Sequence, residues 1–545
     1  MKHTFKYGVL FIFFALGLFS CSKQIDDAYQ NPNADTKVPP ETLLPQIIAS
    51  MAANYAGHGP ANDARYIGAY VQNFALCNPN SNFDQQGYTN TDVAQSTWRT
   101  HYYDIGQNCM KMIEWAKDEQ KWDYVGVGQA IFAWSWLTLA DYYGEVIVKE
   151  AFNTNLITFK FDTQEDAYNK SKEYAFAALE NLNRTDGNVS QANLALGDAY
   201  FYNGDVNKWK KFVNSMLARY YNHFSNKSSY KADSVIFYAN NGITNSADDA
   251  MVKFAATALS ATNSFFGPLR NNLTGTGVTS PTAIRQSAYI ANLMNGTNAE
   301  FSTVEDPRAW YLLRGNTAGT IRGVEQNAGQ NALVSTDRPE NFWGQPQTSS
   351  TPSNIAPTVE SGRYIFRNAA PFPVITAAEV HFMKAEAALR KGDRTTALQA
   401  YRDGISNNFD MLTSTFNVNI PVGKEITEPV KTTFLSNTTV VPATEAGLNM
   451  SKIMLQKFIA MYAYGALETW MDMRRFHYTD IDAGTGNQVY RDLVIPTLFP
   501  DNGGKTVQRM RPRFNSEYVW NRLELERIGA TTNDYHVKEL WITQP

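Results

Sequence analysis

The stretch ITAAEVHFMKAEAALRKGDRTTALQAYRDGI, residues 375–405, decides the fold class of this 545-residue chain. Its apolar residues recur at steps of four, three and four, the spacing of one helix face: Ala378, Phe382, Ala385 and Leu389. Gly392 is suited to end that helix, and Asp393 can cap a second helix directly after it. The stretch therefore predicts two consecutive helices joined by a Gly-Asp turn.

The second predicted helix presents Ala397, Tyr401 and Ile405 on its inner face. Two helices of this length, with small residues where they cross, resemble a tetratricopeptide repeat. Such repeats stack, so further helix pairs are expected elsewhere in the chain.

Other helical patterns place these pairs in two blocks, at about residues 92–240 and 374–475. Residues 128–145 are apolar on nearly every side, which predicts a helix buried all round. Asp205 is a plausible N-cap for a helix with one apolar stripe. A last strong helix is expected over residues 452–470.

The stretch between the two blocks, residues 254–373, has a different character. It contains eight arginines and no lysine, and its short apolar segments alternate with turn signals. Bulky aromatics such as Trp310 are poor linker residues, so we expect long ordered loops and small strands. Residues 476–545 are similarly irregular and are expected to close a single domain that spans 41–545.

The N-terminus has the layout of a secretory signal peptide. Lys2 and Lys6 precede the uncharged run GVLFIFFALGLF, residues 8–19, which is too short to favour a membrane-spanning helix. The run ends in Leu-Phe-Ser-Cys, which resembles a bacterial lipobox with Cys21 as the lipidated residue. We therefore expect residues 1–20 to be removed and residues 21–40 to form a lipidated tether, with an ordinary signal peptide as the alternative.

Composition excludes some classes of protein. Without residues 1–20, which hold two lysines and no acid, 46 basic residues face 52 acidic ones, a net charge of −6. This balance gives no electrostatic case for nucleic-acid binding. Only Cys77 and Cys109 remain after Cys21, and we interpret both as buried apolar residues rather than as a bridge.

Catalytic and metal signatures are weak. The seven histidines form no HExxH motif and no close pair, so no metal site is predicted. A calcium-binding loop that begins at Asp480 is not predicted, because its twelfth position, which needs a bidentate acidic residue, is Arg491. A glycosidase would need two facing carboxyl groups. Asp141 and Glu145 are candidates by location only, and pairing with nearby cations is the favoured interpretation.

Aromatic residues in polar loops remain as candidates for ligand binding, because sugars stack their C–H faces on such rings. For each ring, the alternative of packing the loop onto the core is equally weighted. Three segments and the insert supply the candidates: Asn82, Phe83, Tyr88, Phe265, Phe266, Arg270, Trp310, Arg338, Asn341, Phe342 and Trp343.

Taken in order, these features resemble the SusD/RagB family of nutrient-binding outer-membrane lipoproteins. After the lipobox, the resemblance rests on segments that follow one another along nearly the whole chain: NPNADTKVPPETLLP (31–45), LADYYGE (139–145), GDVNKWKKFVNSMLARYY (204–221), ITAAEVHFMKAEAALRKGD (375–393), QKFIAMYAYGALETWMDMRRF (456–476) and RPRF (511–514).

The resemblance implies a mainly α SusD-like fold, with about four tetratricopeptide-like helix pairs carrying an irregular, ligand-facing half. It implies a cell-surface, outer-membrane lipoprotein without cofactor or enzymatic activity. Such a protein captures an oligosaccharide or peptide and passes it to a SusC-like TonB-dependent β-barrel transporter, for which it acts as a lid. A surface glycoside hydrolase using a carboxylate pair and a pure assembly scaffold are the alternatives.

The lipobox resemblance makes a direct prediction. Replacing Cys21 with Ala removes the sulfur that would carry the lipid chains, and several chains are needed for stable anchoring. The C21A protein should therefore move from the membrane fraction to the soluble fraction on cell fractionation. Retention in the membrane fraction would show that a different anchor holds the protein.

Overall fold

The computed structural model describes residues 37–53, 63–87, 95–259, 262–270, 273, 283–347, 357, 359–512 and 516–545. Cys21, the signal peptide and Tyr88 lie outside these ranges. Within them the protein is mainly helical, and strands are confined to four short segments. None of the helices in these ranges has the length and the apolar character that crossing a bilayer requires.

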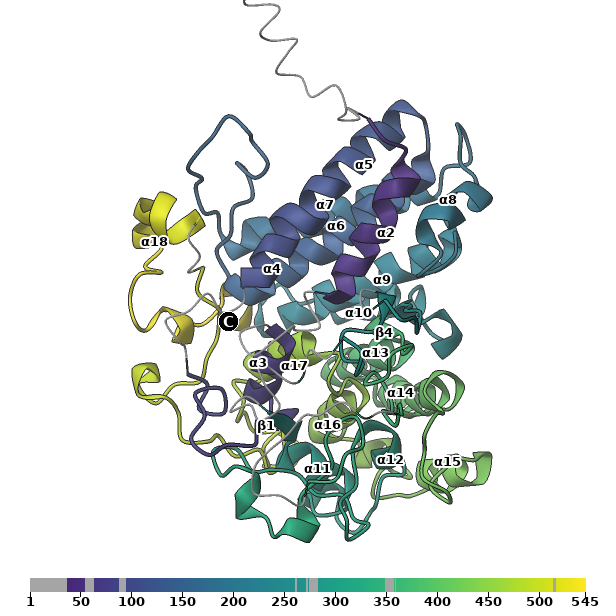
Figure 1. Ribbon diagram of the computed structural model, residues 1–545, viewed down its shortest axis with the longest axis vertical. Helices are drawn as coiled ribbons and strands as arrows, with labels where there is room; N and C mark the ends of the chain where they lie inside the picture. The colour runs from purple at the N-terminus through teal and green to yellow at the C-terminus, as the bar shows by residue number, and fades with distance from the viewer. Residues whose placement is uncertain are drawn as a thin grey trace, which may run out of the picture.

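Most helices of the first part of the chain lie together in the upper part of Figure 1, whereas α3 (Asp63–Tyr70) lies lower, beside α17 (Ala466–Arg475). Their bounds are α2 Pro40–Ala53, α3 Asp63–Tyr70, α4 Gln95–Arg99, α5 Gly106–Asp118, α6 Trp122–Tyr143, α7 Gln164–Leu182, α8 Gln191–Asp198, α9 Val206–His223 and α10 Ala232–Asn240. Asp205 caps α9 as expected, because its side chain accepts hydrogen bonds from the N–H groups of Asn207 and Lys208. Helix α6 is buried along nearly its whole length, also as expected.

Most of the later helices lie below this first group in Figure 1, whereas the last one, α18 (Arg522–Arg527), lies at the left of the view, at the height of the first group. They are α11 Ala288–Met294, α12 Ala309–Leu312, α13 Ala377–Lys391, α14 Arg394–Thr415, α15 Glu428–Leu435, α16 Met450–Ala460, α17 Ala466–Arg475 and α18 Arg522–Arg527. The predicted pair is α13 and α14: Gly392 ends α13 with a φ of +87°, and Asp393 accepts from the Thr396 N–H at the start of α14. The prediction of a tetratricopeptide-like helical fold is confirmed.

The expected continuous helix over 452–470 is wrong. Residues 461–465 form a turn between α16 and α17, and Ala463 has a φ of +69°. Its N–H donates to the Asn73 side chain at 2.7 Å instead of continuing a helix. The apolar periodicity that predicted one helix reports only local spacing, so it could not reveal this tertiary hydrogen bond.

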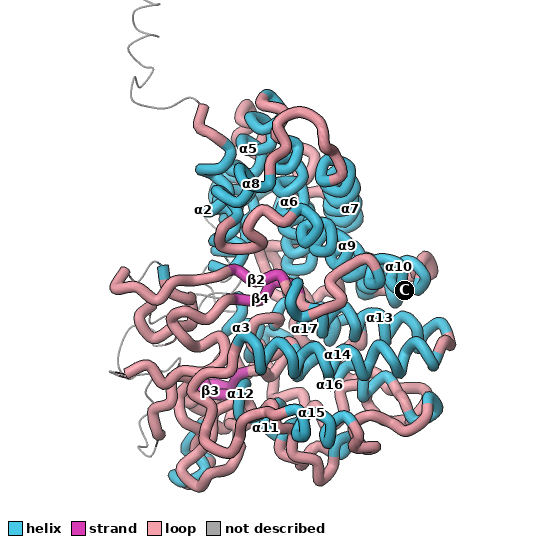
Figure 2. Tube along the Cα trace, turned by 90° about the vertical axis from the view of Figure 1, so that its right-hand side faces the viewer, coloured by secondary structure: helices cyan, strands magenta, loops and turns pink. Residues whose placement is uncertain are grey.

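Helices pack in consecutive antiparallel pairs, and the two groups join into one body. Contacts are extensive between α6 and α7, between α13 and α14, and between α9 and α10, while α9 and α10 also contact α13. Figure 2 shows helices in the upper part and along the lower right of the molecule, and long loops at the lower left. The loops correspond to the predicted irregular half.

Two small antiparallel sheets attach the loops to the helices. Strand β1 (Phe74–Leu76) pairs with β3 (Ile284–Gln286), with Ala75 opposite Arg285. Strand β2 (Ala250–Val252) pairs with β4 (Phe372–Ile375), which leads directly into α13. Each sheet therefore joins segments about 120 or more residues apart in the sequence.

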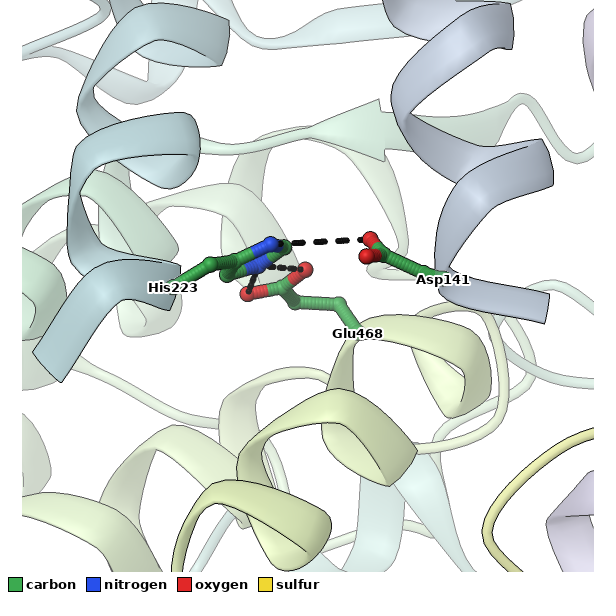
Figure 3. Close-up of side chains that lie close together, drawn as sticks. All are labelled: Asp141, His223 and Glu468. Carbon is green, nitrogen blue, oxygen red and sulfur yellow. Dashed lines mark hydrogen bonds and ion pairs between the residues drawn. The ribbon is translucent and has the colours of Figure 1, made fainter. Parts of the chain in front are cut away.

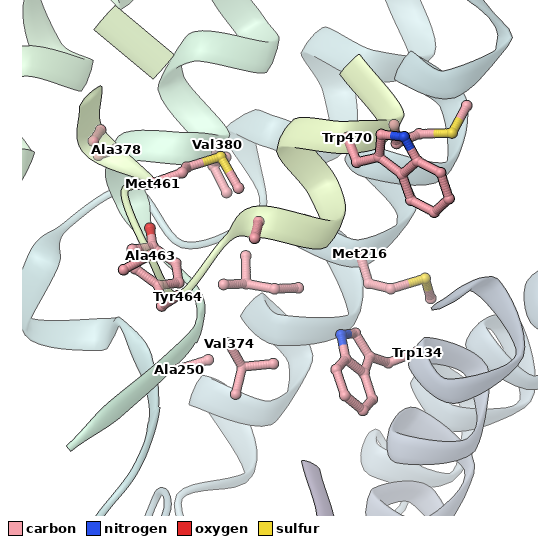
Figure 4. Packing of buried hydrophobic residues seen from close by; sticks show 14 of the residues in the cluster. Trp134, Met216, Ala250, Val374, Ala378, Val380, Met461, Ala463, Tyr464 and Trp470 are labelled. Atoms are coloured by element: carbon pink, nitrogen blue, oxygen red, sulfur yellow. The ribbon is translucent and has the colours of Figure 1, made fainter. Parts of the chain in front are cut away.

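A shared apolar core lies where these elements meet. Figure 4 shows Trp134 of α6, Met216 of α9, Val374 of β4 and Trp470 of α17 in this core. Each fully buried large side chain contributes about 1.5–3 kcal/mol. The two cysteines, Cys77 and Cys109, are buried and unbridged, as the sequence suggested.

Buried ion pairs cross the same region. Arg475 Nη1 lies 2.8 Å from Glu386 Oε1, and its Nη2 lies 2.6 Å from Asp472 Oδ1. Lys457 Nζ lies 2.7 Å from the other Asp472 oxygen. All four residues are buried, so each charge depends on its partners for neutralisation.

Replacing Arg475 with Met should lower the free energy of unfolding by about 3–5 kcal/mol, because Glu386 and Asp472 would each lose one of their two cationic partners and keep buried charges that Arg390 and Lys457 neutralise only in part. Urea unfolding followed by tryptophan fluorescence measures this change. The control is Arg522→Met, which removes an exposed ion pair with Glu526 and should cost no more than about 1 kcal/mol. Equal effects of both substitutions would contradict the structural role of Arg475.

Candidate functional site

Five of the predicted ligand-binding residues are buried: Phe265, Phe266, Asn341, Phe342 and Trp343. The ring of Phe342 stacks on Phe366 with 4.4 Å between ring centroids, and Trp343 Nε1 donates to the Phe266 carbonyl at 2.8 Å. These rings hold the loops on the core, which is the alternative left open by the sequence. Buried in this way, they present no face to a ligand.

The other described candidates are more accessible. Asn82 is exposed, whereas Phe83, Arg270, Trp310 and Arg338 are half-buried. Lys424 Nζ lies 4.7 Å from the centroid of the Trp310 ring. Arg338 Nε donates to two backbone carbonyls of its own loop. These side chains help to shape their loops, and Tyr88 lies outside the described residues.

One buried carboxyl group joins two of the loops. The Asp84 carboxylate accepts hydrogen bonds from the N–H groups of Leu76 and Asn327. Burial raises the pKa of Asp84 to about 7, against the effect of these backbone donors. The loop that carries Asn82 and Phe83 is thus fixed against residues 325–330, the chain segment that leads to Arg338.

Asp141 and Glu145, the candidate carboxylate pair, are both engaged with other side chains. Tyr168 donates its hydroxyl hydrogen to Asp141, and Glu145 forms an ion pair with Arg509. The contacts of Glu145 therefore agree with the favoured interpretation, in which it pairs with a nearby cation.

Asp141 also belongs to a compact buried cluster with His223 and Glu468, in which the His223 ring lies between the two carboxylates (Figure 3). His223 Nε2 lies 3.0 Å from Glu468 Oε2, and Nδ1 lies 3.5 Å from Asp141 Oδ2. These three residues come from α6, α9 and α17, so the cluster ties three helices together.

Ligand atoms in this cluster are close enough to hold a metal ion, but its surroundings are cationic. Arg219 Nε lies 3.4 Å and Lys457 Nζ lies 3.3 Å from the Glu468 carboxylate. These two positive charges already neutralise the carboxylate that would attract a metal ion, and they would repel one. Burial raises the pKa of Asp141. Burial acts in the same direction on Glu468, but the charges of His223, Lys457 and Arg219 outweigh it and hold the pKa of Glu468 well below its usual value.

A small cavity borders this cluster and is lined by Trp134, Arg219, Tyr464 and Glu468 among others. Its volume of about 50 Å³ accommodates a few water molecules. Sites for small-molecule ligands typically enclose about 300–1,000 Å³. The cluster is therefore an internal ion-pair network with hydration space, and it offers no room for a nutrient.

A larger cleft of about 510 Å³ lies at the N-terminal end of α5. We call it the aromatic cleft, and define it by the residues that line it: Trp98, Arg99, Tyr102, Gln107, Ile147, Ala151, Phe152, Asn153, Thr154, Leu156, Phe159, Ser516 and Glu517. Four aromatic rings beside several polar side chains make it a suitable site for a small ligand.

The backbone around the aromatic cleft is unusual. Both π-helices of the described chain, η1 (Thr100–Ile105) and η10 (Ser516–Trp520), contribute to its lining. Phe152 has a φ of +64°, which is uncommon for a residue with a side chain. π-Helical segments and left-handed residues concentrate at functional sites. Their meeting at one cleft favours a functional role over simple packing.

Sequence reasoning missed this cleft. Trp98 lies in a helix and is only 6% exposed, so nothing in its position indicates a ligand site. The loop that supplies Phe152 and Phe159 has the sequence AFNTNLITF, residues 151–159, which mixes aromatic and amide side chains like the segments that were selected. That composition was the available signal, but nothing local showed that residues 516–517 lie opposite.

Comparison with known proteins agrees with this architecture. The sequence pattern of the SusD-like family described as "Starch-binding associating with outer membrane" matches residues 32–500. The fold and this match define a SusD-like protein. The chain belongs to this SusD-like family.

Solved structures with the same fold include a SusD/RagB family protein from Bacteroides thetaiotaomicron, with 22% identity and a TM-score of 0.66, covering 93% of this chain and 99% of that one. A chitin-binding SusD homologue from Flavobacterium johnsoniae has 15% identity and a TM-score of 0.65, covering 92% and 98%. A further chitin-binding protein has 20% identity and a TM-score of 0.65, covering 92% and 98%. No protein of curated function matches the sequence.

The ion-pair network predicts a pH dependence. Because the folded-state pKa of Glu468 lies below its unfolded value of about 4.3, its stabilising contribution is complete above that pH and is lost as the pH falls further. In Glu468→Gln, melting temperature should be lower at pH 7 and should fall less steeply below about pH 4.5. An unchanged slope in the variant would contradict this role, and Glu526→Gln, at an exposed ion pair, is the control.

Proposed function

We propose that this protein is a cell-surface lipoprotein that binds an oligosaccharide and delivers it to a SusC-like TonB-dependent β-barrel transporter, for which it acts as a non-enzymatic lid. The observation that carries this proposal is the family match over residues 32–500, because that family is described as starch-binding and as associating with the outer membrane. Cys21 would supply the lipid anchor.

The site geometry supports a sugar as the nutrient. The aromatic cleft offers the half-buried rings of Tyr102, Phe152 and Phe159 for stacking, and amide and hydroxyl groups for hydrogen bonds to ligand hydroxyls. Two structural relatives are named for binding chitin, which is also a polysaccharide. Peptide binding is the second candidate, and it would use the same ring surfaces together with backbone hydrogen bonds.

A calorimetric panel of purified protein against soluble glycans and peptides tests the ligand class. We expect saturable binding to at least one glycan, no binding to peptides, and an unchanged oligosaccharide length after prolonged incubation. Shortened products on chromatography would favour the glycoside hydrolase alternative. Absence of binding to every glycan would contradict the proposed function.

Detergent extraction of the native membrane tests the partner. We expect a large β-barrel protein to co-purify with the intact chain, and the same extraction from cells that express C21A to give less of it. A wild-type protein that purifies without any barrel would contradict the transporter part of the proposal.

A further inference from the structure

The lining of the aromatic cleft includes a buried carboxylate residue, Glu517. Glu517 is only 5% exposed, and across the described ranges no Lys, Arg or His forms an ion pair with it. Asn521 Nδ2 donates to Glu517 Oε2 at 2.9 Å. Burial raises the pKa of Glu517, against the effect of hydrogen bonds from Asn521 and Ser516. A ligand that donates a hydrogen bond here would replace hydration that the carboxyl group has lost.

The position of Glu517 is fixed by the opposite wall. Asn521 Nδ2 also donates to the Phe159 carbonyl at 2.8 Å, and Asn521 Oδ1 accepts from the Phe159 N–H at 3.2 Å. One side chain thus holds both the carboxyl group and the loop 147–159. Glu517, which lines the cleft, is therefore held in place without a ligand.

One part of the remaining lining is apolar. Ile147, Ala151 and Leu156 lie with the rings of Phe152 and Phe159 around the same space. An unsubstituted hexose carries a hydroxyl at nearly every ring carbon, and a hydroxyl against such a wall loses its hydrogen bonds to water. A sugar with an apolar substituent gains from burying that substituent there.

We propose that the aromatic cleft is a subsite for a 2-acetamido sugar, with Glu517 accepting a hydrogen bond from the acetamido N–H and the Ile147–Ala151–Leu156 wall receiving its methyl group. This rests on the proposed function, since it names the glycan class that the lipoprotein takes. Glu517 and Leu156 are then residues that determine specificity.

Other sugar classes satisfy fewer of these groups. An acidic sugar would place its carboxylate near the carboxylate of Glu517. A free amino sugar would meet the Glu517 charge but would leave the apolar wall unfilled, and the exposed guanidinium of Arg99 lines the same cleft. The acetamido group alone combines an N–H donor with a methyl group.

Chitohexaose and cellohexaose form a matched pair of probes, because they share a β-1,4 backbone and differ only in the substituent at C2. Isothermal titration calorimetry of the full-length mature protein should show chitohexaose binding at least about tenfold more tightly, the effect of filling one small apolar pocket. A partly deacetylated chitohexaose should lose most of that preference.

Substitutions locate the preference. Glu517→Leu removes the acceptor and should reduce chitohexaose affinity about tenfold, whereas Glu517→Gln keeps an acceptor oxygen and should stay within about threefold of wild type. Leu156→Asn places a polar group on the apolar wall and should remove most of the preference. Its matched control is Leu523→Asn on α18, where the side chain is 82% exposed and the affinity should not change.

Each outcome decides between the two proposals. Equal affinity for both hexaoses, or a preference that survives both Glu517→Leu and Leu156→Asn, overturns the acetamido subsite while leaving glycan binding intact. Binding of another glycan, together with no binding of either hexaose, also overturns the acetamido subsite and leaves glycan binding intact. Should Glu517→Leu fail to fold, as judged by circular dichroism, Leu156→Asn and its control decide. Failure to bind any glycan overturns the proposed function itself.

Discussion

The structure depends on neutralising the charges that α17 carries into the core. Glu468, Asp472, Arg474 and Arg475 are all buried on this one helix of ten residues. A buried charge without a partner costs several kcal/mol, so α17 can pack only where oppositely charged side chains of other helices lie next to its own. Those partners come from α9, α13 and α16, as with Arg219, Glu386 and Lys457. The ion pairs therefore fix the register of the two helical groups, while the apolar core supplies most of the stabilisation.

The same constraint explains why the irregular stretch 254–373 contains arginine and no lysine. Arg308 is fully buried and bonds Asp306, Asn408 and Gln456 at once, and Arg314 reaches both Glu340 and the Ser361 carbonyl. A planar guanidinium can satisfy several acceptors in a fixed geometry, which a lysine ammonium cannot reproduce. These arginines are used to hold long loops on the helices. Arg308 and Arg314 are consequently not available to bind acidic ligands.

Local patterns were sufficient for the helices and insufficient for the site. The α13–α14 pair follows from apolar spacing and from Gly392 and Asp393, because helix formation and capping are decided within a few residues. The break at Ala463 was missed because its hydrogen-bond partner, Asn73, lies 390 positions away. Loop aromatics such as Trp343 lack periodicity, so their composition could not separate an inward ring from an outward one.

The aromatic cleft shows how the helical scaffold and the irregular half combine. The Tyr102 hydroxyl donates to the Ile147 carbonyl at 2.8 Å and accepts from the Ile147 N–H at 2.9 Å, so the start of one wall is fixed to η1. Trp98 packs between Tyr143 of α6 and Phe161, which fixes the other end of the same loop.

Three segments far apart in the sequence thus form one surface whose shape is set before a ligand arrives. A binding surface that is already ordered avoids the entropic cost of fixing side chains and loops on association. In this protein the rigid helix pairs provide that order, and the loops provide the groups that a ligand meets. Ligand specificity can therefore change through the loop at 147–159 and the 516–521 segment without disturbing the ion pairs that hold the fold together.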